Sequence, residues 1–284
     1  MEVDLGEFYR NFEDRFIKWA QSSEDMKAAF VVGSRARKEN AADEWSDLDI
    51  IIYTTNPQYY LEESDWLNSL GELLCTFVYK TSAGEPERLT LFNGGYQVDF
   101  VVHFYSELLD MVHAKIVPQN FYRGVRMIVD KESGASDIVP GADNKPRKKV
   151  INEEMFAQIV NMFWFISLYI AKQLLRGELW AAKDREADSR QLLLQMIEWH
   201  AVAKNGEDYD TWHAGRFINE WADKSILAEL KNAYGHYDYT DSRHALSAAM
   251  ALFSRLSHEV ADRYGYRYPQ NVENSIVDWI NMHK

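Results

Sequence analysis

Two aspartates one residue apart, Asp47 and Asp49, are the side chains best suited to do chemistry in this 284-residue chain. They lie in the run "SDLDIIIY", whose apolar end is typical of a buried strand. Alternate side chains of a strand point to the same face, so the two carboxylates would lie together and repel each other unless a cation separates them. Oxygen ligands of this kind suit Mg²⁺, which proteins hold with one or two carboxylates plus substrate phosphates. The pair therefore predicts a magnesium site.

A third carboxylate, Asp99, lies in "QVDFVVHF", another apolar stretch where aspartate is a poor strand former. If its strand lies beside the strand of the first two aspartates, all three carboxylates converge. The alternative is a structural aspartate on an edge strand.

A turn that could bind phosphate precedes the aspartates. Gly33 and Ser34 follow the apolar run "AAFVV", and glycine there lets the backbone approach a ligand while free N–H groups cradle a phosphate. Arg35 adds a planar cation that can donate to two phosphate oxygens, and an exposed loop arginine is the alternative. A phosphate-binding turn before a metal-binding Asp-x-Asp pair predicts chemistry on a nucleoside triphosphate.

The elements that must position these residues follow from the apolar spacing. An amphipathic helix is expected over 5–20, followed by a mixed sheet with helices against it. The strands are expected at 28–32, 48–53, 73–79, 89–92 and 96–104, with Asn93-Gly94-Gly95 as a hairpin turn between the last two. Further helices are expected near 57–70, 105–115, 152–176, 179–204, 224–234 and 243–264.

The segment 133–150 is rich in Gly, Pro, Ser and charge and marks the expected domain boundary. The prediction is an α/β (α+β) domain over 1–140 and a helical-bundle domain over 141–284. Its basic cluster Lys145, Arg147, Lys148 and Lys149 is interpreted as a solvated linker.

Composition limits the partners. The formal net charge of −13 opposes nucleic-acid binding and favours a cationic small molecule. The single cysteine, Cys75, lies in an apolar run and is expected to be a buried core thiol that forms no internal disulfide. The first residues lack the features of a signal peptide, and the longest apolar stretch is too short for a membrane span, so we expect a cytoplasmic protein. Two domains that close a cleft would suffice in a monomer, which is the expected oligomeric state.

The order of Gly-Ser, Asp-x-Asp and a later strand carboxylate is similar to that of the nucleotidyltransferase superfamily. A closer resemblance covers nearly the whole chain: "GSRARKENAADEWSDLDI", "QVDFVVHF", "FWFISLYIAKQLLRGEL", "LLLQMIEWHAVAKNG" and "ALFSRLSHEVADRYGYRYP" resemble the bacterial aminoglycoside 6-adenylyltransferases. The resemblance implies transfer of AMP from ATP to a hydroxyl of a cationic, streptomycin-like antibiotic, with Mg²⁺ as the metal.

The resemblance also implies roles for single residues. Asp47 and Asp49 would hold the metal, and Asp99 would complete its site, assist deprotonation of the acceptor, or both. The implied nucleotide-binding residues are Gly33, Ser34, Arg35 and Lys172. Lys172 is equally well interpreted as a lysine that extends from an apolar helix to solvent.

The acceptor requires anions, and the helical half supplies candidates in Asp184, Glu186, Asp188 and Glu198. Acidic residues at the head of a helix also stabilise its N-terminus, which is the structural alternative. The stretch 182–191 departs from the family's acidic pattern, so the acceptor stays open. Trp164 and Trp199 could stack on an acceptor but are better interpreted as core. Two alternatives remain: another small-molecule or protein acceptor, and a nucleotide-binding protein without turnover.

Overall fold

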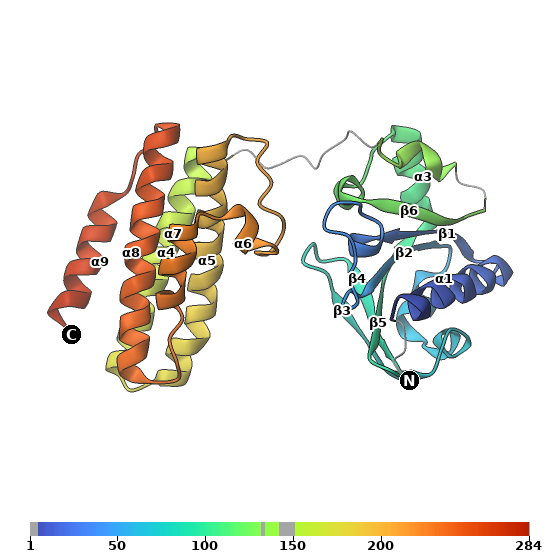
Figure 1. The fold of residues 1–284 in the computed structure, drawn as a ribbon, viewed down its shortest axis with the longest axis horizontal. Coiled ribbons are helices and arrows are strands. Elements are labelled where there is room, and N and C mark those ends of the chain that lie inside the picture. The colour runs from blue at the N-terminus through green and yellow to red at the C-terminus, as the bar shows by residue number, and fades with distance from the viewer. Residues whose placement is uncertain (1–4, 132–133, 142–150, 284) are drawn as a thin grey trace. The chain divides into compact units, whose positions relative to one another are not determined.

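The computed structural model describes residues 5–131, 134–141 and 151–283. The chain forms two compact units, residues 1–147 and 148–284, which are described separately (Figure 1). The basic cluster lies outside the described residues, as does more than half of the boundary segment.

The first unit is built on a six-stranded mixed sheet with strand order β3-β4-β5-β2-β1-β6 (Figure 1). Neighbouring strands run antiparallel except the central β2 and β5, which are parallel. This confirms the mixed sheet and adds one strand, β6, that the apolar pattern did not indicate. The strands are β1 (Met26–Val32), β2 (Leu48–Thr54), β3 (Leu73–Lys80), β4 (Pro86–Phe92), β5 (Tyr96–Phe104) and β6 (Val125–Asp130).

One face of the sheet is covered by helices. The predicted first helix is present as α1 (Leu5–Ser22), and its Phe12 and Phe16 are fully buried against Phe100 of β5. The short helix α2 (Pro57–Glu62) covers the same face. The even-numbered residues of β5 therefore face α1, and Asp99 lies on the opposite face of the sheet.

The opposite face is covered only in part. The helix α3 (Tyr105–Ala114) and short 3₁₀ turns bury β1 and β2, with Leu108 and Phe121 packing in one cluster with Phe30. Farther out, side chains of β4 and β3 on this face are half-buried or exposed. We call these residues the open face: Phe77, Tyr79, Glu87, Leu89 and Leu91.

The interpretation of Cys75 as a buried core thiol is wrong, because its side chain is exposed. It lies on β3, the edge strand, where the helices that cover the sheet do not reach. The preceding residue, Leu74, is 55% exposed. An apolar run identifies a strand but does not reveal its place in the sheet.

The hairpin predicted at Asn93-Gly94-Gly95 is confirmed. Phe92 of β4 pairs with Tyr96 of β5 in an antiparallel register. Gly94 and Gly95 have φ of +95° and +83°, a conformation that favours glycine. The turn fixes how β4 lies beside β5, and therefore which residues of β4 face Asp99.

The second unit contains helices and no strand among its described residues. Three long helices pack against one another, α4 (Glu153–Leu175), α5 (Leu179–Asn205) and α8 (Tyr239–Tyr264) (Figure 1). They agree with the predicted runs, so the expected fold class is confirmed. The remaining helices are α6 (Ile218–Trp221), α7 (Lys224–Leu230) and α9 (Gln270–Met282), of which α6 and α9 were not predicted.

The expectation that the longest apolar stretch is too short for a membrane span is wrong, because α4 extends over 23 residues and, among the described helices, is the one with the length and apolar composition of a span. Its side chains make the contacts of a core helix: Phe163 stacks on Phe253 of α8 with ring centroids 3.7 Å apart. Trp164 is fully buried and its indole N–H donates to the Tyr268 hydroxyl. We therefore interpret α4 as the central helix of this unit.

Candidate active site

Three carboxylates converge at one end of the parallel strand pair. Asp49 of β2 lies directly opposite Asp99 of β5, and Asp47 comes just before β2. Each carboxylate places an oxygen within 4.8 Å of the oxygens of the other two. All three side chains are half-buried. Such a set of hard oxygen ligands matches the coordination of a divalent cation such as Mg²⁺.

Asp99 is the most perturbed of the three. Burial raises the pKa of its carboxyl to about 7, and the negative charges of Asp49, Glu87 and Asp47 add to the effect. Its Oδ1 atom is fully buried and, among the described residues, has no hydrogen-bond partner. A buried acceptor without a donor is costly unless a ligand or a cation satisfies it. The geometry of the triad therefore fits a bound cation.

The pKa of Asp99 leads to a prediction on stability without metal. Its folded-state pKa of about 7 lies above the ordinary 3.8, so the folded state binds this proton more tightly than the unfolded chain does. The stability that the Asp99 proton gives to the folded state is fully present below pH 4. It is lost as pH rises to about 7, because this carboxyl ionises at lower pH in the unfolded chain than in the folded state. Asp99→Asn removes this loss, so in EDTA the variant should melt at least about 2 °C above the wild type at pH 8 but not at pH 4.

Thermal unfolding followed by circular dichroism at both pH values checks this expectation. Addition of Mg²⁺ at pH 8 should raise the melting temperature of the wild type more than that of Asp99→Asn. A constant difference between the two proteins across the pH range would contradict the assignment of the shift to Asp99.

The turn between β1 and the aspartates brings Gly33 and Ser34 against the triad. Gly33 has φ +69°, and a Cβ atom there would lie 2.2 Å from Oδ2 of Asp49. Ser34 is 6% exposed and its hydroxyl has no described partner. The absence of a side chain at residue 33 thus lets the turn approach Asp49, and the Ser34 hydroxyl is left available for a ligand.

Arg35 is engaged within the protein. Its guanidinium donates to the backbone carbonyls of Ser46 and Asp47, at 2.6 and 2.9 Å, and lies 3.6 Å from the ring centroid of Tyr9. These contacts hold the chain just before β2 and thereby position Asp47. The role of Arg35 as a phosphate ligand stays a prediction.

A polar cavity of about 520 Å³ opens beside Ser34. Arg10, Arg37 and Arg126 contribute to its wall, together with acidic residues such as Glu13. Arg126 is held by both carboxylate oxygens of Glu13 at 2.8 Å. The cavity gathers these arginines beside Ser34, but none of the three triad aspartates contributes to its wall.

Glu87 is a fourth carboxylate near the triad that the sequence analysis missed. Burial raises the pKa of Glu87, and Asp47 and Glu85 add to the effect through their charges. In the sequence it lies just before the run 89–92 that is expected as a strand, and nothing distinguishes it from a residue that faces solvent. The register between β4 and β5 was needed to find it.

Lys172 lies in the second unit, on α4. Its side chain is exposed, with Nζ 5.4 Å from the ring centroid of Trp279 on α9. This contact gives Lys172 a partner inside the helical unit. Its assignment to the triphosphate stays a prediction.

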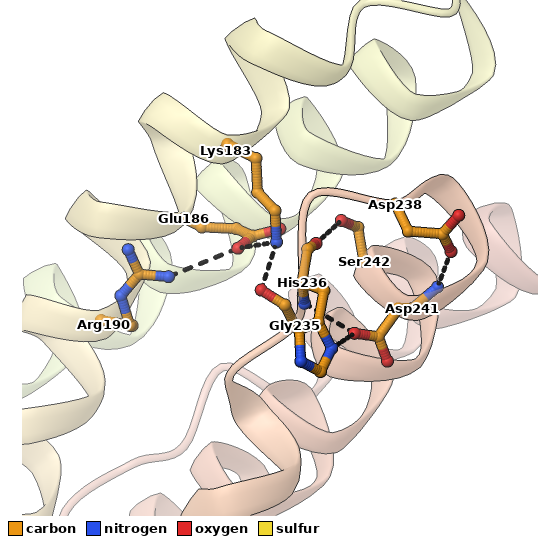
Figure 2. A network of polar contacts seen from close by, with 8 residues as sticks. All are labelled: Lys183, Glu186, Arg190, Gly235, His236, Asp238, Asp241 and Ser242. Carbon is orange, nitrogen blue, oxygen red and sulfur yellow. Dashed lines mark hydrogen bonds and ion pairs between the residues drawn. The ribbon is translucent and has the colours of Figure 1, made fainter.

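The acidic residues of α5 that were predicted to bind the acceptor differ in whether basic side chains already pair with them. Glu186 is buried and its carboxylate accepts from Lys183 at 2.9 Å and from Arg190 at 3.3 Å (Figure 2). Lys183 also donates to the Gly235 carbonyl, which ties α5 to the segment before α8. Asp184 is exposed, and Glu198 is half-buried.

The remaining candidates of the second unit have structural partners. Asp188 pairs with Arg185 at 2.8 Å on the exposed side of α5. Trp164 and Trp199 both belong to the core of the unit, in agreement with their interpretation. The assignment of Asp184, Glu186 and Glu198 to the acceptor stays a prediction.

Comparison with known proteins places the chain in a family. A family model described as "Streptomycin adenylyltransferase" matches residues 9–283. The aminoglycoside 6-adenylyltransferase of Staphylococcus aureus is 27% identical over 272 residues, covering 91% of this chain and 94% of that protein. That of Bacillus subtilis (strain 168) is 25% identical over 265 residues, covering 90% and 91%.

Among solved structures, an aminoglycoside 6-adenyltransferase from Bacillus subtilis superposes with a TM-score of 0.46 at 19% identity, covering 95% of this chain and 96% of that one.

With its α/β fold, its three converging carboxylates and this family match, the chain is an enzyme of the nucleotidyltransferase class. It belongs to the streptomycin adenylyltransferase family, whose model spans nearly its whole length. The resemblance found in the sequence is thereby confirmed.

Proposed function

We propose that the protein transfers AMP from ATP to a hydroxyl group of a streptomycin-like aminoglycoside and releases pyrophosphate, in a reaction that requires Mg²⁺. The observation that carries this proposal is the convergence of Asp47, Asp49 and Asp99, whose carboxylate oxygens lie within 4.8 Å of one another. Membership of the family supports the choice of ATP and of the acceptor class.

The metal would be held by Asp47 and Asp49, with Asp99 as the third ligand or as a neighbouring base. The buried, unsatisfied Oδ1 of Asp99 supports a cation at this position. A bound Mg²⁺ would neutralise charge on the triphosphate and lower the pKa of the acceptor hydroxyl. Because the residues offer only carboxylate oxygens, a hard cation suits them better than a softer metal.

The chain's own groups would position the phosphates and move the proton. In the reaction the acceptor oxygen bonds to the α-phosphorus, and the bond from that phosphorus to the bridging oxygen breaks as pyrophosphate leaves. Backbone N–H groups at Gly33 and the Ser34 hydroxyl would hold the departing pyrophosphate. The acceptor proton would pass to Asp99 or to water, and a bound cation would keep the Asp99 carboxylate ionised and able to accept it.

The charge of the protein supports a cationic acceptor. The formal net charge is −13, and a negative surface concentrates cations near the site. The names of the relatives from S. aureus and B. subtilis state position 6 as the modified one. We therefore propose position 6 of the acceptor as the one to examine first in the product.

The test is acceptor-dependent release of pyrophosphate from ATP. We expect release that requires both Mg²⁺ and streptomycin, disappears in Asp99→Asn, and yields an AMP–streptomycin product whose linkage is located by NMR. A folded protein that binds ATP but releases no pyrophosphate with streptomycin or other aminoglycosides would contradict the proposed acceptor. Absence of Mg²⁺-dependent ATP binding would contradict the nucleotide site itself.

A further inference from the structure

A cationic acceptor needs anions close to its reacting hydroxyl, and the structure offers one beside the triad. The following inference rests on the proposed function and concerns the acceptor side of the same site. It starts from the open face of β3 and β4, which the helices of the first unit leave uncovered.

The register of the sheet places Glu87 next to Asp99. Leu89 of β4 is paired with Asp99, and Glu87 with Val101, so Glu87 lies on the same face one diagonal position away. Diagonal neighbours in an antiparallel pair are about 7–8 Å apart. A long side chain can bridge part of this separation, and the charge of Glu87 acts on Asp99. Glu87 is nevertheless not among the three carboxylates whose oxygens converge, which are Asp47, Asp49 and Asp99.

Within the part of the chain that the structure describes, Glu87 has no cationic partner. Among the described residues it makes no hydrogen bond or ion pair, and the charges that act on it, from Asp47 and Glu85, are negative. The next residue, Arg88, points to the other face, where it is 4% exposed and donates to the Tyr60 carbonyl. Glu85 differs, because His103 lies 3.7 Å from its carboxylate.

The surface around Glu87 is suited to a ring. Phe77 is paired with Leu89, and Tyr79 with Glu87, so the two aromatic residues border Leu89 and Glu87 on the edge side. Their side chains are 54% and 66% exposed, which are high values for aromatic residues on a strand. Aromatic faces pack against sugar rings and attract guanidinium and ammonium groups. The open face therefore combines one unpaired carboxylate with an apolar platform beside the reacting carboxylate.

We propose that Glu87 binds an ammonium or guanidinium group of the acceptor, while the open face of β3 and β4 carries the ring to which that group is attached. The acceptor hydroxyl then reaches Asp99 from the β4 side, opposite the Gly33-Ser34 turn and its phosphates. This assigns acceptor recognition to the catalytic unit itself, in addition to any contribution from α5.

The test is a kinetic comparison of Glu87→Gln with the wild type, using streptomycin at saturating Mg²⁺ and ATP. Loss of a charge-assisted hydrogen bond should raise KM for streptomycin at least about tenfold. The KM for ATP should stay within about twofold, because Glu87 is not one of the three carboxylates that would hold the metal. The change in kcat should be smaller than the change in KM for streptomycin, since the charge of Glu87 acts on Asp99 only from a distance. Glu87→Asp, which keeps the charge, should recover part of the affinity.

The matched control is Glu72→Gln, which removes one exposed negative charge from the same unit at a position bonded to Asn93. Its KM for streptomycin should equal that of the wild type. Equilibrium dialysis of streptomycin, with Mg²⁺ and a non-hydrolysable ATP analogue, gives the same comparison without turnover. Wild-type affinity in Glu87→Gln, or a loss confined to kcat or to the KM for ATP, would overturn the inference.

The outcome also separates this inference from the proposed function. If the wild type modifies streptomycin and Glu87→Gln does so with unchanged KM, only the role of Glu87 is wrong. If the wild type neither binds nor modifies streptomycin, the proposed acceptor is wrong, and the role of Glu87 is overturned with it.

Discussion

Replacing Asp49 by asparagine should lower kcat/KM for AMP transfer at least about a thousandfold, or about 4 kcal/mol of transition-state stabilisation. The asparagine would keep the size of the side chain but remove the charge that converges with Asp47 and Asp99. Without that charge the triad loses its affinity for a divalent cation, and charge on the triphosphate is left uncompensated. Pyrophosphate release at increasing Mg²⁺ concentrations measures the effect.

The fold should survive this substitution, because it relieves repulsion among three half-buried carboxylates. The matched control is Glu39→Gln, an exposed carboxylate in the connection between β1 and β2. It should keep wild-type kcat/KM. If Asp49→Asn retained more than a tenth of the wild-type kcat/KM, the triad would not be the metal site.

Gly33→Ala is the second substitution with a large expected effect, on stability and on activity together. The backbone at Gly33 has φ +69°, where an alanine costs about 1–2 kcal/mol. Its Cβ would lie 2.2 Å from Oδ2 of Asp49, so the carboxylate or the turn must move. A displacement of about 1 Å at a reacting centre costs about a hundredfold in rate, and we expect at least that loss in kcat. Steady-state kinetics and thermal unfolding measure the two effects.

Gly134→Ala separates backbone strain from the collision with Asp49. Gly134 has a similar φ of +62°, but a Cβ there meets nothing within 4 Å. It should lose a similar amount of stability and keep full activity. Wild-type kcat in a folded Gly33→Ala variant would show that the close approach of the turn to Asp49 is not needed for the reaction.

The sequence predicts the triad because the physics of a strand is local. Alternation alone places Asp47 and Asp49 on one face of the strand. An aspartate between apolar residues is unfavourable in a strand, so Asp99 is expected to have a role that compensates for it. The central strands and the long helices follow from apolar periodicity in the same way. The pattern in α9, with Val272, Ile276 and Ile280 on one side, was equally available in the sequence but was not recognised.

Residues whose role depends on the register or on the direction of a side chain could not be predicted. Glu87 becomes a neighbour of Asp99 only through the pairing of β4 with β5. Arg35 has the right chemistry for a phosphate, yet its guanidinium bonds to the carbonyls of Ser46 and Asp47. The exposure of Cys75 depends on which strand forms the edge of the sheet, and that order is set by long-range pairing.

The parallel pairing of β2 with β5 links correct folding to catalytic competence. The two strands are separated in the chain by α2, β3 and β4, so their contact closes a long loop and is expected to form slowly. A slip of one residue would turn Asp99 toward α1 and a neighbouring apolar side chain toward Asp49. The burial of Val98 and Phe100 opposes that slip. The same hydrophobic residues that stabilise the sheet therefore also select the strand register in which the three carboxylates converge.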